Sequence, residues 1–83
     1  MIITRGWHNE GIIKKVLSRK EILEFLKSGD TLLYYSIYAK IYVENVDGEK
    51  RGAVRFDTYL KLMREGTIKR LEQRYLTEIY ALA

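Results

Sequence analysis

The chain contains no cysteine and no proline, and it has one histidine, His8. Without cysteine, disulfides and thiolate zinc sites are excluded, and the absence favours a reducing compartment such as the cytoplasm. A lone histidine in a loop-like Gly-Trp-His-Asn stretch is expected to be solvated, because a nucleophilic triad needs a base held beside a hydroxyl or thiol. Without proline or a Gly/Ser-rich stretch nothing marks a boundary, so residues 1–83 are expected to form a single domain.

The sequence also lacks the patterns of several common ligand sites. Asp47 and Glu49 flank a glycine but lack the ligand spacing of a calcium loop, and no glycine-rich phosphate-binding loop occurs. The stretch from Met1 to Arg5 is too short and too soon interrupted by polar residues to be a signal peptide or a membrane span. We therefore expect a cytoplasmic protein with no cofactor, no metal and no enzyme activity, which works by binding a partner.

Basic residues outnumber acidic residues in the chain. Of 83 residues, 47% are hydrophobic and 31% charged, and fifteen Lys and Arg against eleven Asp and Glu give a net charge of +4. The excess is concentrated between Lys50 and Arg74, where eight basic residues stand against three acidic ones. Such a segment favours an anionic partner, although it equally serves as a solubilising face. So short a chain without disulfide or metal also allows a homodimer.

Two helices have clear signals at their ends. Ser18 and Glu21 form the Ser-x-x-Glu pattern of a capping box before an apolar run, which predicts a helix from about Arg19 to Ser28. Residues 57–58, Asp-Thr, provide a cap for a second helix, which Gly66 ends.

The segment between the helices is rich in β-branched and aromatic residues. Residues 31–46 predict one strand, and Asp47-Gly48 predicts a two-residue hairpin turn into a second strand. The register that follows pairs Glu44 with Arg51, Tyr42 with Ala53, and Lys40 with Arg55.

After the second helix, residues 67–74 fit either a strand or a further helix, and residues 75–82 fit a final strand. The expected fold class is therefore α+β. It is a small single domain in which an antiparallel β-hairpin or sheet packs with two short helices, in the order (β)αββα(β)β.

Tyrosines recur every fourth residue in the predicted strand. In one strand this spacing places Tyr34, Tyr38 and Tyr42 on a single face, where Lys40 and Arg55 would be neighbours whose repulsion a bound anion relieves. Rings interleaved with cations suit stacked bases and their phosphates. The same rings could instead pack beneath a helix, and spacing by four also aligns residues on a helix. The predicted binding face comprises Tyr34, Tyr38, Lys40, Tyr42 and Arg55, and Arg51 is a further predicted binding residue.

A second basic cluster lies in and after the second helix. Its members are Arg64, Lys69, Arg70 and Arg74.

Within residues 54–83, a capped helix ends in a Leu-x-x-x-Gly-hydrophobic turn and leads into a Tyr-Leu-Thr strand. The residues concerned are Thr58, Leu62, Gly66, Ile68, Tyr75, Leu76 and Thr77. This pattern resembles the second half of winged-helix DNA-binding domains, over about a third of the chain and without their tri-helical start. The resemblance implies that Thr58, Lys61 and Arg64 face a duplex. It also implies that Lys69, Arg70 and Arg74 contact phosphate from a hairpin wing.

Two functions from different classes remain open. The first is a small basic nucleic-acid-binding accessory protein. The alternative is a small inhibitor of the kind that phages and mobile elements encode, of anti-CRISPR or anti-restriction type, which binds a host nucleic-acid enzyme. Tyrosine and arginine are enriched at binding hot spots, so the same surface suits both. The expected partner is nucleic acid or an acidic or nucleic-acid-processing protein, with no membrane involved.

Overall fold

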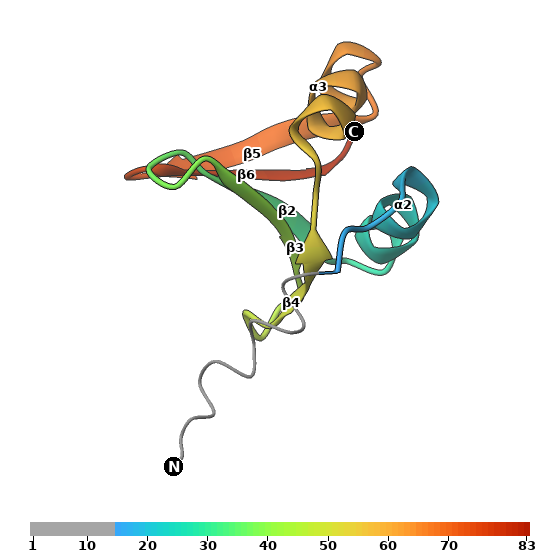
Figure 1. Ribbon diagram of the computed structural model, residues 1–83, viewed down its shortest axis with the longest axis horizontal. Helices are drawn as coiled ribbons and strands as arrows, with labels where there is room; N and C mark the ends of the chain where they lie inside the picture. Colours follow the sequence, from blue (N-terminus) through green and yellow to red (C-terminus); the bar gives the residue numbers. More distant parts are fainter. Residues whose placement is uncertain (1–14) are drawn as a thin grey trace.

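The computed structural model describes residues 15–83 and contains a five-stranded antiparallel sheet with two helices on one of its faces (Figure 1). The strands are β2 (Thr31–Tyr35), β3 (Lys40–Glu44), β4 (Lys50–Ala53), β5 (Ile68–Arg74) and β6 (Thr77–Leu82), and the helices are α2 (Arg19–Lys27) and α3 (Phe56–Arg64). The strands lie side by side in the order β4-β3-β2-β6-β5. The predicted α+β class is confirmed. His8 lies outside the described residues.

Helix α2 begins as its capping pattern predicts. The backbone N–H of Ser18 donates to Glu21 Oε1 at 2.9 Å, and the backbone N–H of Glu21 donates to Ser18 Oγ at 3.2 Å. The first of these bonds lowers the pKa of the Glu21 carboxyl. Gly29 follows the helix at φ 103°, a conformation that glycine adopts without steric cost.

Helix α3 is where it was predicted, but its cap differs. The N-cap residue is Arg55, which makes no side-chain capping bond. Asp57 lies in the first turn, where its Oδ1 accepts hydrogen bonds from the Arg55 Nε–H at 3.2 Å and from the Thr58 N–H at 2.9 Å. A carboxylate in the first turn offsets the positive end of the helix dipole, which is why this sequence starts a helix without a capping side chain.

The prediction of one strand over residues 31–46 is wrong, because the chain reverses at residues 36–39 and forms β2 and β3. The Tyr38 N–H donates to the Tyr35 carbonyl at 3.1 Å, and the Ala39 N–H donates to the Ser36 carbonyl at 3.2 Å. Ala39 has φ 53°. The turn contains Ser36 but no Gly, Asn, Asp or Pro, so most of the residues that usually mark a reversal are missing from this segment.

The turn at Asp47-Gly48 is confirmed, but the register around it is partly wrong. Asn45 Oδ1 accepts the backbone N–H groups of Asp47 and Glu49, each at 2.9 Å, which widens the loop beyond two residues. A bulge between Val43 and Glu44 then places Glu44 opposite Lys50 instead of Arg51.

Of the other two predicted pairings, one is confirmed and one is wrong. The pairing of Tyr42 with Ala53 is confirmed. Lys40 lies opposite Tyr35 of β2, and Arg55 has left the sheet to cap α3, so these two cations are not paired. Residues 67–74, left open between strand and helix, contribute strand β5, which pairs with β6 around a bulge between Arg70 and Glu72.

The core lies between the sheet and the helices. Its fully buried side chains come from α2, β2, β3 and α3, and they are Ile22, Leu32, Val43 and Leu62. Leu17 closes one end of this layer, where its N–H donates to the Ala53 carbonyl at 2.9 Å. At this point the backbone comes so close that a Cβ on Gly52 would lie 2.8 Å from Leu17 Cδ2. Glycine is therefore needed at position 52 for contact rather than for its dihedral angles.

Candidate functional site

The three tyrosines expected on one face lie in three different settings. Tyr42 is opposite Leu33, the neighbour of Tyr34, so Tyr34 and Tyr42 point to opposite faces of the sheet. Tyr38 lies in the turn between β2 and β3. The single tyrosine face is therefore a wrong prediction, and its cause is the reversal at residues 36–39, which breaks the alternation of faces.

Tyr42 belongs to a packed polar cluster on the face away from the helices. Its ring centroid lies 6.0 Å from that of Tyr35, and Lys50 Nζ lies 5.2 Å from the Tyr42 centroid. The Tyr35 hydroxyl donates to the buried carboxylate of Glu44, which also lies 3.5 Å from Lys50 Nζ. Burial and this carboxylate raise the pKa of Tyr35. These contacts explain Tyr42 as a structural residue.

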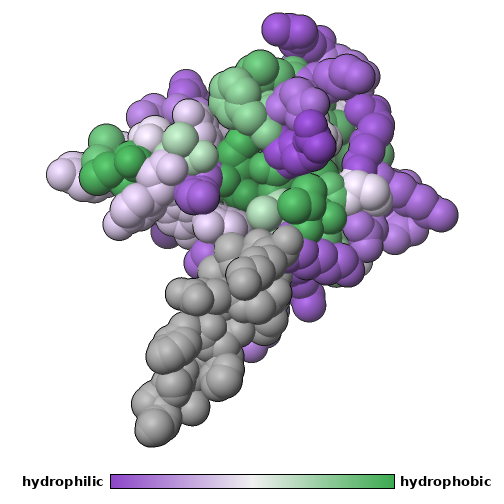
Figure 2. Space-filling view, in the orientation of Figure 1, coloured by the Kyte–Doolittle hydropathy of each residue, from purple (hydrophilic) through white to green (hydrophobic). Residues whose placement is uncertain are grey.

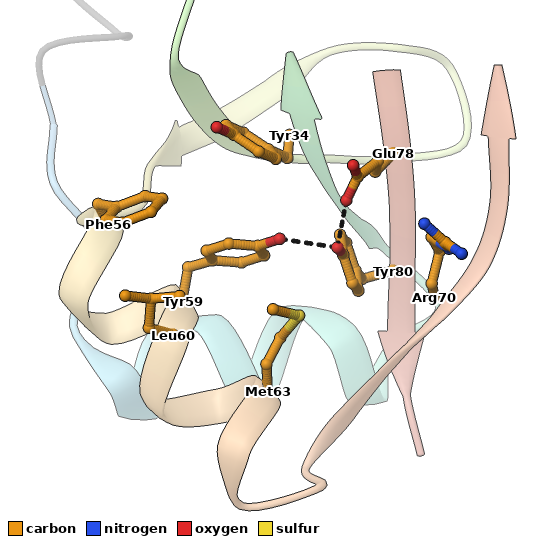
Figure 3. A pocket seen from close by; sticks show the side chains of 8 residues that line it. All are labelled: Tyr34, Phe56, Tyr59, Leu60, Met63, Arg70, Glu78 and Tyr80. Atoms are coloured by element: carbon orange, nitrogen blue, oxygen red, sulfur yellow. Dashed lines mark hydrogen bonds between the residues drawn. The ribbon is translucent and has the colours of Figure 1, made fainter. Parts of the chain in front are cut away.

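Tyr34, on the helical face, forms one wall of an open cleft of about 530 Å³ between α3 and the sheet (Figure 3). The cleft is lined by Tyr34, Phe56, Tyr59, Leu60, Met63, Arg70, Glu78 and Tyr80. The Tyr34 centroid lies 5.3 Å from that of Tyr59 and 6.4 Å from that of Phe56. These rings form a continuous aromatic wall, and Phe56, with 55% of its surface exposed, is its outermost member.

A chain of hydroxyl groups crosses the base of the cleft. The Tyr80 hydroxyl donates to Glu78 Oε1, and the Tyr59 and Tyr80 hydroxyl oxygens are 2.7 Å apart. Because the only hydroxyl proton of Tyr80 is given to Glu78, Tyr59 donates to Tyr80. Burial raises the pKa of Tyr80, and its bond to Glu78 adds to this; burial also raises the pKa of Tyr59. The chain of hydroxyl groups ends in the Glu78 carboxylate, which can only accept hydrogen bonds.

Arg70 supplies a cation at the rim of the cleft. It lies opposite Tyr80 in the β5–β6 register, so its side chain is on the helical face. Its Nη1 donates to Gln73 Oε1 at 3.4 Å, and among residues 15–83 no carboxylate oxygen lies within 4.0 Å of its guanidinium. A guanidinium without a carboxylate partner beside aromatic rings can hold an anionic group while a flat ring stacks on the wall.

Three of the other predicted arginines are held by carboxylates. Arg51 Nε donates to the buried Asp30 Oδ2 at 3.0 Å, and its guanidinium lies 5.3 Å from the Phe25 ring centroid. Arg55 bonds Asp57 at 3.2 Å, and Arg74 Nε bonds Glu72 at 2.6 Å. These pairs account for the three arginines without a ligand.

The remaining predicted cations are exposed, and within the described part of the chain none has a carboxylate partner. They are Lys40, Lys61, Arg64 and Lys69. Arg64 lies one turn after Leu60 and so flanks the cleft. Lys69 and Arg74 lie opposite Ala81 and Thr77, on the sheet face away from Arg70. The basic cluster is therefore split between the two faces, and the duplex-facing role implied for Thr58, Lys61 and Arg64 stays a prediction.

Sequence reasoning found Tyr34 and Arg70 but missed most of the cleft. Phe56, Tyr59, Leu60 and Met63 follow the i, i+3, i+4, i+7 spacing of one helical face, which indicates a core-facing stripe. The exposed Phe56 shows that this stripe extends past the core. Tyr80 and Glu78 alternate with residues of the opposite face, and nothing in the sequence links them to the helix.

Among residues 15–83 no three His, Cys, Asp or Glu side chains gather where they could hold a metal ion. None of the helices described here is long and apolar enough to cross a membrane. No protein-family model, no curated protein and no solved structure matches the chain.

Proposed function

We propose that this protein binds single-stranded nucleic acid, taking one base onto the aromatic wall of the cleft and holding a neighbouring phosphate with Arg70. The observation that carries the proposal is the position of Arg70, which has no carboxylate partner among residues 15–83 and stands at the rim of a cleft walled by Tyr34, Phe56 and Tyr59. Stacking on an aromatic side chain stabilises a bound base by about 1–3 kcal/mol.

The position of the site between α3 and the sheet favours an unpaired strand. A base inside a duplex is stacked on both sides and cannot enter a cleft between a helix and a sheet, whereas an unpaired base can turn out of the strand. Glu78 adds a hydrogen-bond acceptor at the cleft wall. This acceptor suits the amino groups on the edges of cytosine, adenine and guanine better than the carbonyl-rich edge of uracil or thymine.

Charge around the cleft supports the same partner. Arg64 flanks it on α3, Lys61 lies on the same helix, and Arg70 lies on β5, each without a carboxylate partner within the described range. Several cations on neighbouring elements attract a polyanion before any specific contact forms.

The test is a fluorescence anisotropy titration of labelled twelve-nucleotide single strands of DNA and RNA, repeated over a series of salt concentrations. We expect Arg70→Glu to weaken binding about tenfold or more, since a charge-assisted phosphate contact is lost. Lys69→Glu is the matched control, because it makes the same charge reversal one residue away on the opposite face of the sheet. It should cause a smaller loss that salt screens away.

Equal losses in the two variants would show that only the overall charge matters and would contradict the cleft as the site. Affinity that does not change with salt would contradict nucleic-acid binding altogether. In that case the alternative, an inhibitor that binds a host nucleic-acid enzyme, becomes the leading function.

A further inference from the structure

Two turns meet at one end of the sheet and expose apolar side chains there (Figures 1 and 2). The Ser36 backbone N–H and its Oγ–H both donate to the Leu76 carbonyl, at 3.0 and 2.9 Å, which ties the β2–β3 turn to the β5–β6 turn. The exposed side chains are Ile37, Tyr38, Tyr75 and Leu76, which we call the hairpin tip. Tyr38 is 69% exposed and Tyr75 is 90% exposed.

Neither the backbone conformation nor the packing of the turn explains why a tyrosine occupies position 75. Its φ is 49°, in the left-handed region that Gly, Asn and Asp occupy in tight turns and that bulky residues rarely adopt. Its ring is almost fully exposed, so packing gives nothing in return for the strained backbone. A residue that is unfavourable in a turn and does not pack is the kind that a binding partner accounts for.

The hairpin tip continues directly from the cleft. Tyr34 lies opposite Glu78 in the β2–β6 register, and both strands run from the cleft into the two turns. The chain from Tyr75 to Glu78 spans at most roughly 10 Å. A strand with one base in the cleft therefore reaches the tip with its next two or three nucleotides, because stacked nucleotides repeat at about 3.4 Å and spread further when unstacked.

A cation lies beside the first of the two turns. Lys40 follows this turn and has no carboxylate partner among residues 15–83, whereas Arg74, which precedes Tyr75, is paired with Glu72. From this charge and from the continuity with the cleft we infer that the hairpin tip is a second stacking subsite, on which Tyr75 and Tyr38 hold bases of the strand that leaves the cleft. This inference rests on the proposed function.

The test compares Tyr75→Asn with wild-type protein on labelled strands of two and twelve nucleotides. Asparagine tolerates a positive φ, so the variant should fold and its thermal midpoint should equal or exceed that of wild type. We expect about tenfold weaker binding of the twelve-nucleotide strand and unchanged binding of the dinucleotide, which the cleft alone holds. Val46→Asn is the control, since Val46 is as exposed as Tyr75 but lies in the β3–β4 turn.

If Tyr75→Asn binds the twelve-nucleotide strand as wild type does, the inference is wrong while the proposed function stands, and the tip is left as a surface for a protein partner. If Tyr75→Asn and Val46→Asn weaken binding equally, the tip is likewise not a subsite. If the wild-type protein binds neither strand, the proposed function fails, and the inference fails with it.

Discussion

Tyr80 contributes both to the stability of the fold and to the lining of the cleft. Its ring lies edge-on to that of Tyr59, with the centroids 5.4 Å apart. Its hydroxyl lies between the Tyr59 hydroxyl and the Glu78 carboxylate and bonds to both. Both neighbours depend on it, because without the hydroxyl a buried donor on Tyr59 and an acceptor on Glu78 lose their partner. This one group therefore joins Tyr59, in the aromatic wall, to Glu78 on the sheet.

Replacing Tyr80 with Phe should lower the free energy of unfolding by about 1–3 kcal/mol near neutral pH, the cost of leaving buried polar groups unpaired. Chemical denaturation followed by circular dichroism measures it. Tyr38→Phe is the control, because that ring is exposed in a turn.

The pH dependence of stability follows from the same residue. Burial and the bond to Glu78 raise the pKa of Tyr80 in the folded state above the value of 10.0 that an unfolded tyrosine has. A group with a raised folded-state pKa contributes stability that is complete below its unfolded pKa and declines as pH rises beyond it. The wild-type denaturation midpoint should therefore fall above about pH 10, and the fall should be smaller in Tyr80→Phe. Equal falls in both proteins would mean that Tyr80 ionises as freely folded as unfolded.

At the scale of elements, the segment before α2 is joined to β4 by close backbone contact. Val16 forms a parallel bridge to Ala53, and the Ala53 N–H donates to the Lys15 carbonyl at 2.8 Å. Gly52 lies under Leu17 with no room for a methyl group. This contact fixes where the chain enters α2.

Gly52→Ala should therefore lower the free energy of unfolding by about 1–3 kcal/mol through overpacking against Leu17. Leu17→Ala alone should cost about 2–5 kcal/mol because it leaves a cavity. The added methyl fills part of that cavity, so the double variant should cost less than the sum of the two. Strict additivity in a double-mutant cycle of denaturation midpoints would show that the two residues do not contact.

The elements differ in how far the sequence reveals them. Helix α2 is predictable because Ser18 and Glu21 encode both ends of its capping box locally, and the Asp47-Gly48 turn is predictable because glycine marks it. The turn at residues 36–39 is not predictable, since its reversal depends on β2 and β3 pairing through Leu32 and Val43 rather than on turn residues. The bulge at Glu44 arises from the side chain of Asn45, which no pairing rule anticipates.

The candidate site is predictable only in part, because its geometry depends on the turn at residues 36–39. The face on which Tyr34 or Tyr42 lies depends on where the chain reverses, so the missed turn placed Tyr42 on the other side of the sheet from Tyr34. Arg70 and Tyr34 could be named because exposed arginines and aromatic runs are visible in sequence. Their meeting with Phe56 could not, because α3 reaches the cleft only through tertiary packing.

At the scale of the whole molecule, the two faces of the sheet differ because both helices pack on one of them. The helical face holds the cleft, with its aromatic wall and Arg70, and the opposite face holds the Tyr35, Tyr42, Glu44 and Lys50 cluster. Both faces carry tyrosines and cations, but the cleft lies on the helical face, and on the opposite face the cation beside the tyrosine rings, Lys50, is paired with Glu44. We therefore propose that nucleic acid binds at the helical face.

Ultraviolet cross-linking of the protein to a single strand, followed by mass spectrometry of the peptides, tests this assignment most directly, because it reports which rings contact bases. We predict adducts on Tyr34 or Phe56 in the cleft, and loss of those adducts in Arg70→Glu. Adducts confined to Tyr42, on the opposite face, would contradict the account.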